Sequence, residues 1–321
     1  MIVLISLILF FSLRAQAEVQ NQTTDLGEVG NHQIAQAFEK YKSKKEICRI
    51  RSNYPRVILT GFGLFSGIDS NISGVVSQVL ASTKFWPSQF NTKTKLPNTD
   101  QSLEAFYHLN KSDLGARTAQ RIISIDGRKI DICFLTIDVK WDLASAITIY
   151  QMHHFQPHFV LMTGRGESFA SFEGGANNYA IPYSGFHSNG EKDFENTPKQ
   201  TYVLNPNDPG VKSTIPLTWN PFLARERSLD LLDSMGYESR AARYARDKND
   251  YICNNIAFTV ASAALNPPVI NLAGNLISLK PKLRWQPKVG FFHYPQDAIT
   301  KEPELEIWAR IILRQINLVK E

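Results

Sequence analysis

Short apolar runs alternate with helical patterns through the first half of the chain. The β-branched run over residues 56–60 predicts a buried strand that breaks into the loop Gly61-Phe62-Gly63. Strand and helix in alternation favour an α/β sheet with parallel members. The same reasoning predicts further strands over 129–138 and 157–164, and helices over 73–82, 113–123 and 143–154.

The second half of the chain begins with a long polar segment. Residues 183 to about 214 are rich in Gly, Asn, Pro, Asp and Lys, which is typical of a long loop or insertion. Apolar periodicity then predicts helices over 222–235, 254–264 and 304–318, with a last short strand over 289–293. No internal repeat is visible.

The N-terminus has the pattern of an export signal. An apolar run over residues 1–13 is followed by Ala15 and Ala17 in a small-x-small arrangement, which predicts a signal peptide over 1–17. About a dozen apolar residues are short for a membrane span, and an uncleaved anchor is the alternative. Residues 18–54 are expected to be a polar linker with one helical candidate, and 55–321 the folded body. These patterns predict a periplasmic or secreted protein without membrane contact after cleavage.

The composition indicates a globular protein. Of 321 residues 43% are hydrophobic, enough for a sizeable core, and the net charge of +5 comes from 35 basic and 30 acidic residues spread along the chain. A long basic block is missing from the sequence, so we predict no nucleic-acid partner.

The chain has three cysteines, and an odd number leaves at least one thiol unpaired. Cys133 lies in an apolar run and has the pattern of a buried, inert cysteine. Cys48 and Cys133 can alternatively pair in an oxidising compartment, which would leave Cys253 free. The histidines and cysteines do not have metal-ligand spacing, so we predict no metal and no other cofactor.

An α/β sheet binds ligands beyond the carboxyl ends of its strands, which here directs attention to the loop after Leu59, the loop after Met162 and the short strand that delivers His293. Cys253 begins an apolar helix, whose N-terminus stabilises a thiolate; His293 ends a strand; and Glu173 lies in a glycine-rich stretch after a strand. A carboxylate that accepts a bond from the imidazole could orient it as the third member of a triad. Each residue alone is more often structural or solvated, and Glu167 is the nearest rival for the carboxylate.

Four short motifs occur in order within residues 55–318. They are Thr60-Gly61-Phe62-Gly63-Leu64-Phe65-Ser66-Gly67 with Asn71; Glu173, Ala176 and Asn178; Cys253-Asn254-Asn255; and Gly290-Phe291-Phe292-His293-Tyr294-Pro295. In these motifs the chain resembles the pyroglutamyl-peptidase I (pyrrolidone-carboxylate peptidase) family.

This resemblance implies a fold and a reaction. The fold would be a three-layer α/β/α sandwich with a mixed, largely parallel sheet. Cys253, His293 and Glu173 would form the catalytic triad of a cysteine peptidase that removes an N-terminal pyroglutamyl residue from peptides through an acyl-enzyme. Phe62 and Phe65 would pack on the lactam ring, and Asn71 would hold its polar edge. Many relatives self-associate, so a homo-oligomer is open.

The chain also departs from the family pattern. The family continues after its glutamate with an acidic pair and an arginine, whereas residues 179–186 contain neither, and insertions near 185–214 and 266–288 lengthen this chain. A cysteine amidohydrolase that acts on a cell-wall or γ-glutamyl amide is therefore a second hypothesis. A catalytically inactive binding homologue is the third.

Overall fold

The fold is built on one mixed sheet. The structure, a computed structural model, describes residues 20–22, 26–64, 70–82, 88–91, 116–180, 202–207, 210–245, 251–265, 269–272, 277–279, 283–300 and 303–320. Eight strands of this part form the sheet, in the order β10 (Ser239–Ala241), β7 (Ala170–Glu173), β13 (Lys288–Tyr294), β6 (Phe159–Arg165), β2 (Arg56–Phe62), β5 (Arg128–Ile137), β4 (Ala116–Ile125) and β3 (Gln89–Phe90).

The four central strands run parallel, and antiparallel pairs flank them. β13, β6, β2 and β5 run parallel to one another, whereas β7 is antiparallel to β13 and β4 is antiparallel to β5. Thr60 pairs with Met162, and Gly164 pairs with His293. The carboxyl ends of β2, β6 and β13 therefore lie at one edge of the sheet, where α/β proteins bind ligands.

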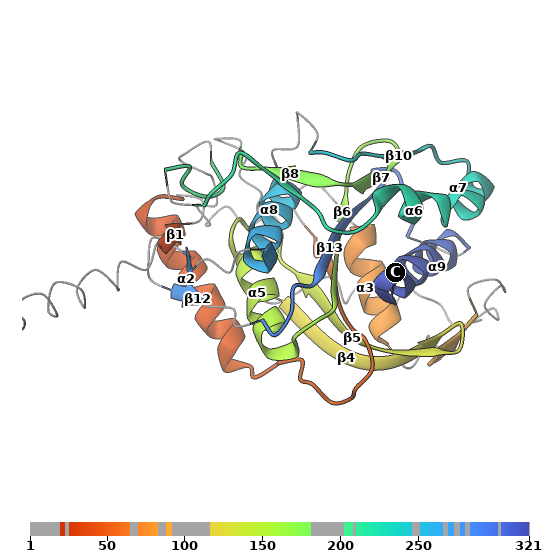
Figure 1. Ribbon diagram of the computed structural model, residues 1–321, viewed down its shortest axis with the longest axis horizontal. Helices are drawn as coiled ribbons and strands as arrows, with labels where there is room; N and C mark the ends of the chain where they lie inside the picture. Colours follow the sequence, from red (N-terminus) through yellow and green to blue (C-terminus); the bar gives the residue numbers. More distant parts are fainter. Residues whose placement is uncertain are drawn as a thin grey trace, which may run out of the picture.

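Helices cover both faces of the sheet. Helices α3 (Ile72–Ala81) and α9 (Glu304–Ile316) pack on one face, and α5 (Leu143–Phe155) and α8 (Ile252–Leu265) pack on the other (Figure 1). Helices α3 and α8 approach the sheet closely at two glycines. A Cβ at Gly61 would overlap the Ser73 carbonyl of α3, and a Cβ at Gly164 would meet the Cys253 sulfur of α8. The predicted three-layer α/β/α sandwich with a mixed, largely parallel sheet is confirmed.

The segment expected to be a polar linker contributes a packed helix. Helix α2 (Gly27–Ser43) lies against α5, with Ile34, Phe38 and Tyr41 buried and the Phe38 ring centroid 5.7 Å from that of Tyr150. An amphipathic stripe on a mostly polar helix is enough to add this outer layer. The prediction that residues 18–54 form a polar linker is therefore wrong where α2 packs on α5, although the expected helix exists.

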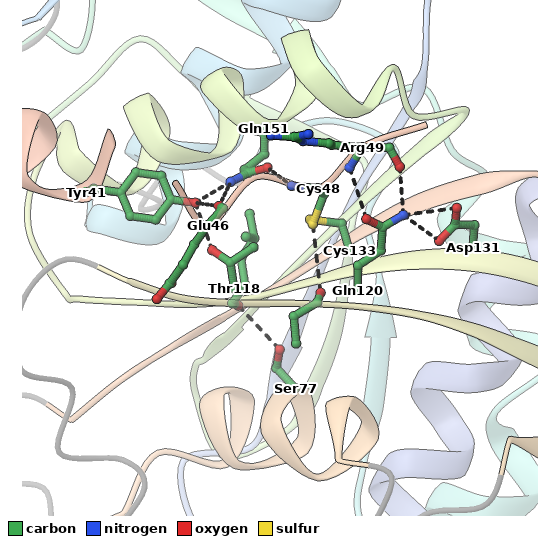
Figure 2. Close-up of a disulfide and its surroundings, with 12 residues drawn as sticks. Tyr41, Glu46, Cys48, Arg49, Ser77, Thr118, Gln120, Asp131, Cys133 and Gln151 are labelled. Atoms are coloured by element: carbon green, nitrogen blue, oxygen red, sulfur yellow. Dashed lines mark hydrogen bonds between the residues drawn. A yellow bond between two sulfur atoms is a disulfide. The ribbon is translucent and has the colours of Figure 1, made fainter. Parts of the chain in front are cut away.

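A disulfide holds the chain after α2 against the sheet. Cys48 pairs with Cys133 of β5, with a Cα–Cα distance of 5.9 Å. Figure 2 shows the amide groups that surround it: the Cys48 N–H donates to Gln151 Oε1 of α5 at 2.9 Å, and Gln120 of β4 bonds both backbone groups of Arg49. Of the two alternatives left open for Cys133, the structure has the disulfide, and Cys253 is the free cysteine.

The helix predicted over 113–123 is wrong from residue 116 on, where β4 begins; residues 113–115 lie outside the described residues. The strand pairs with β5 along its whole length, from Ala116 with Ile137 to Ile125 with Arg128. Asp126 and Gly127 form the two-residue turn between the strands with φ angles of 49° and 78°, and paired positive φ angles suit a tight hairpin. The Asp-Gly turn therefore outweighs the helical periodicity.

The helix predicted over 222–235 is divided in two. Helix α6 (Pro221–Glu226) and helix α7 (Leu229–Met235) are separated at Ser228, which is buried. Its hydroxyl donates to the Ala224 carbonyl and receives a bond from Gln315 of α9 at 2.6 Å. Side-chain bonds of serine to the preceding turn compete with helix continuation.

Several short strands were not predicted. Strands β11 (Val269–Leu272) and β12 (Ile277–Leu279), both within the expected insertion near 266–288, form a separate sheet with β1 (Gln20–Gln22). Strand β8 (Gly175–Asn177) pairs with β9 (Thr214–Pro216). The chain closes with the 3-10 turn η3 (Asn317–Lys320). The predicted signal segment and most of the predicted loop over 183–214 lie outside the described residues. Among those residues no helix is long and apolar enough to cross a membrane.

Candidate active site

Cys253, His293 and Glu173 meet at the carboxyl edge of the sheet. Cys253 is the second residue of α8, and His293 lies near the end of β13, in register with Gly164 of β6. A Cβ built on Gly164 would lie 2.7 Å from Cys253 Sγ and 3.4 Å from His293 Cδ2. Any side chain at Gly164 would therefore displace the thiol, so this glycine makes room for the sulfur beside the imidazole.

The carboxylate partner of the imidazole is Glu173. His293 Nδ1 lies 3.3 Å from Glu173 Oε1, and the Glu173 side chain is only 2% exposed against 12% for His293. Antiparallel pairing of β7 with β13 brings the two residues onto the same face. Glu167, the rival in the sequence, is exposed, and its carbonyl bonds the Gln296 N–H.

The environment of His293 favours its charged form. Burial of the ring opposes a charge, but hydrogen bonds to Cys253 and Glu173 and the negative charge of both partners outweigh it and raise the pKa of His293 to about 9. At neutral pH the ring is thus an imidazolium. A protonated imidazole between a thiolate and a carboxylate can stabilise the nucleophile and later donate a proton to a leaving group.

The start of α8 is fixed by two buried asparagines. Asn254 accepts a bond from the Asn177 N–H at 2.8 Å and donates to the carbonyls of Asn177 and Tyr179, which ties the helix to β8 and the residues after it. Two adjacent asparagines at the start of an apolar helix are the sequence signal for such an anchor, because buried amides need partners.

Asn255 ties the same helix end to α5. Its Oδ1 accepts a bond from the Ser145 hydroxyl at 2.9 Å, and its Nδ2 donates to Asp142 Oδ1 at 3.0 Å. All three residues are fully buried, and Asp142 has a φ of 61° just before α5 begins. This network was missed in the sequence, since its partners are more than 100 positions apart.

Backbone close to His293 also depends on glycine. A Cβ at Gly166 would lie 2.8 Å from the His293 Cβ, and the Gly166 N–H donates to the Tyr294 carbonyl at 2.8 Å. The turn after β6 therefore lies directly against β13. Among the described residues, no group of three or more His, Cys, Asp and Glu side chains could hold a metal ion.

The three predicted substrate-binding residues differ in where they lie in the structure. Phe62 ends β2 and is 3% exposed. Thr60 pairs with Met162, so Phe62 and Gly164, each two positions later, lie on the same face of the sheet, which is the face that α8 covers. Asn71 caps α3: its Oδ1 accepts bonds from the Ser73 N–H and hydroxyl, and its Nδ2 donates to the Gly63 carbonyl at 2.9 Å. Its amide is thus committed to the loop after β2. Phe65 lies outside the described residues.

Comparisons with known proteins give structural similarity only. The chain is similar to the crystal structure of pyroglutamyl peptidase I from Bacillus amyloliquefaciens, with 13% identity over 83% of this chain and 98% of that one and a TM-score of 0.46. It is similar also to a mutant pyrrolidone carboxyl peptidase from Pyrococcus furiosus, with 13% identity over 82% and 97% of the chains and a TM-score of 0.45. No protein-family profile and no curated protein matches the sequence. Any assignment of chemistry to the site must therefore come from the geometry of its own residues.

Proposed function

We propose that this chain is a cysteine peptidase that removes an N-terminal pyroglutamyl residue from peptides. The observation that carries the proposal is the arrangement of Cys253 Sγ beside His293, with His293 Nδ1 bonded to the buried Glu173 carboxylate. A nucleophile, a base and a third group that orients the base form the minimal set for acyl transfer through a covalent intermediate.

The reaction would proceed in two halves. The Cys253 thiolate attacks the amide carbonyl that follows the pyroglutamyl ring, and the proton on His293 passes to the leaving amine as the C–N bond breaks. His293 then takes a proton from water, whose oxygen attacks the thioester carbonyl. The C–S bond breaks, pyroglutamate leaves, and the Cys253 thiolate is restored beside the protonated His293. The first N–H groups of an α-helix have no intrahelical carbonyl to bond, so those of Ile252 and Cys253 in the first turn of α8 would suit the oxyanion.

The pyroglutamyl substrate is supported by the first motif and its position. Phe62 lies at the carboxyl end of β2 on the face that holds Cys253, where a flat ring could pack against a lactam. Asn71 would contribute indirectly, because its side chain fixes the Gly63 carbonyl and the start of α3. We assign it to shaping the loop after β2.

Export from the cytosol is part of the proposal. The Cys48–Cys133 disulfide supports an oxidising compartment, because such bonds are rare in reducing cytosol. Periplasmic or secreted placement also agrees with the apolar N-terminal pattern.

The test is hydrolysis of a pyroglutamyl-linked fluorogenic amide, measured with the oxidised protein beside the same amide linked to proline, glutamine and γ-glutamate. We expect turnover confined to the pyroglutamyl substrate and lost in Cys253→Ala. The matched control is Glu167→Gln, which removes an exposed carboxylate six positions before Glu173 and should leave the rate unchanged. Turnover of the γ-glutamyl amide alone would replace this substrate with the second candidate, and a folded protein inactive on all four would refute the peptidase.

A further inference from the structure

Ser171 lies beside the carboxylate of the proposed triad. It is the second residue of β7, is 1% exposed, and pairs directly with His293 across the antiparallel β7–β13 ladder. Glu173 follows two positions later, so the two side chains point to the same face. Ser171 is thus a neighbour of both members of the His–Glu pair.

The Ser171 hydroxyl donates to the oxygen that faces the imidazole. Its Oγ lies 2.6 Å from Glu173 Oε1, and the same Oε1 lies 3.3 Å from His293 Nδ1. A carboxylate can rotate about its last torsion and offer either oxygen. A second donor on a strand limits this rotation, because β7 is hydrogen-bonded to β13 on one side and to β10 on the other.

The backbone of Glu173 is held separately. Its carbonyl accepts a bond from Trp219 Nε1 at 2.6 Å, and the Trp219 ring lies against Gly290 of β13, where a Cβ would be 2.4 Å from the ring. The main chain of Glu173 is therefore fixed without Ser171. What the serine adds is the orientation of the carboxylate.

We propose that Ser171 is a positioning residue that holds Glu173 Oε1 toward His293 and so maintains the thiolate–imidazolium form of Cys253 and His293. The importance of this role for catalysis rests on the proposed function, but the role itself concerns the protonation of Cys253 and His293 in the enzyme without substrate. Ser171 acts through Glu173 and His293, and its hydroxyl supports the charged carboxylate with a bond inside a buried site.

The thiol offers a readout that needs no substrate. Cys253 is the one cysteine outside the disulfide, so iodoacetamide in the absence of reductant reports on Cys253 alone. Alkylation requires the thiolate, and its rate against pH therefore traces the thiolate–imidazolium pair. We expect Ser171→Ala to lower the rate at neutral pH by about three- to tenfold and to move the midpoint of the profile upward, because the carboxylate stabilises His293 less well.

The same variant should lower kcat for the pyroglutamyl amide about tenfold with little change in KM, since misorientation of a catalytic group affects the transition state more than ground-state binding. Ser171→Thr keeps a hydroxyl and should restore most of the alkylation rate. Ser77→Ala is the matched control: Ser77 is equally buried, donates to the Leu135 carbonyl of β5 and lies on α3. It should leave the alkylation profile unchanged.

An alkylation profile of Ser171→Ala identical to that of the unmodified protein would overturn the inference, as would an equal change in Ser77→Ala. If Ser171→Ala does not fold, Ser171→Thr against Ser171→Val gives the same decision, because these two side chains share a shape and differ in the hydroxyl. An unmodified protein without pyroglutamyl hydrolase activity but with the expected difference in alkylation would refute the proposed substrate and leave the role of Ser171 intact.

Discussion

Two regions of the molecule hold cysteine in different oxidation states. At the carboxyl edge of the sheet, Cys253 stays reduced beside His293, whereas Cys48 and Cys133 are oxidised and buried among α5, β4 and β5. His293 and the Glu173 carboxylate lie beside Cys253, whereas at the disulfide the amides of Gln151 and Gln120 bond the backbone of Cys48 and Arg49. A thiol beside a charged imidazole is reactive, while a buried disulfide is inert, so one region carries chemistry and the other carries stability.

The comparison predicts that the two regions fail in different ways. Cys253→Ala should lower kcat by about four orders of magnitude or more, because no other group can form the acyl-enzyme. The melting temperature should change little, since Cys253 lies at a partly exposed helix end. Steady-state kinetics and calorimetry on one preparation check both halves, and a large loss of stability with retained activity would reverse the assignment.

Removal of the disulfide should have the opposite profile. The bond encloses a separation of 85 residues, which corresponds to about 4 kcal/mol of folding free energy. The double variant Cys48→Ser and Cys133→Ser should lose about this amount in urea unfolding, while the folded fraction keeps its kcat because the triad is untouched. A normal unfolding midpoint would show that the bond is dispensable for the attachment of α2.

Asn255 connects α8 to α5 and should affect both properties. Asn255→Ala removes the partner of Ser145 and Asp142 in a fully buried network, at a cost of about 2 kcal/mol of stability. Because Asn255 lies two positions after Cys253, kcat should fall as well. Gln151→Ala, which removes a buried amide at the other end of α5, should lose comparable stability without the fall in kcat.

The pH dependence separates the reactive region from the inert one. The raised pKa of His293, about 9, means that the imidazolium persists through neutral pH and is lost above pH 9, so kcat/KM should fall there. The stability that the charged ring contributes is complete below its unfolded pKa of about 6.5 and disappears as the pH rises through 9.

The variant Glu173→Gln removes one of the two negative partners of His293, so the alkaline fall in kcat/KM should begin at a lower pH. Urea unfolding of the disulfide double variant should keep the pH dependence of the unmodified protein. An alkaline limb of kcat/KM that stays near pH 9 in Glu173→Gln would contradict the assigned role of this carboxylate.

The sequence predicted the central strands better than the edges of the fold. Strands β2, β6 and β13 and helix α8 were expected because apolar runs that end at glycine or a polar residue are local signals. The pairing of Glu173 with His293 came from motif order. The choice over Glu167 needed the structure, since burial depends on β7 lying against β13.

Features that depend on distant partners could not be predicted. The helical period over 113–123 is real, but β4 forms because β5 and the Asp126-Gly127 turn provide a hairpin partner. Asn71 was assigned to substrate, whereas its bonds cap α3. Ser171 was not singled out, because only the ladder with β13 brings it beside His293.

The most direct test of the catalytic assignment is to trap the covalent intermediate. The protein is mixed with a pyroglutamyl ester or amide, quenched in acid within the first turnover, digested, and analysed by mass spectrometry. We predict a pyroglutamyl thioester on the peptide that contains Cys253, with none on Cys48 or Cys133 and none when an N-terminal proline replaces pyroglutamate. Hydrolysis that continues in Cys253→Ala, or an acyl group on any other residue, would contradict the Cys253–His293–Glu173 triad.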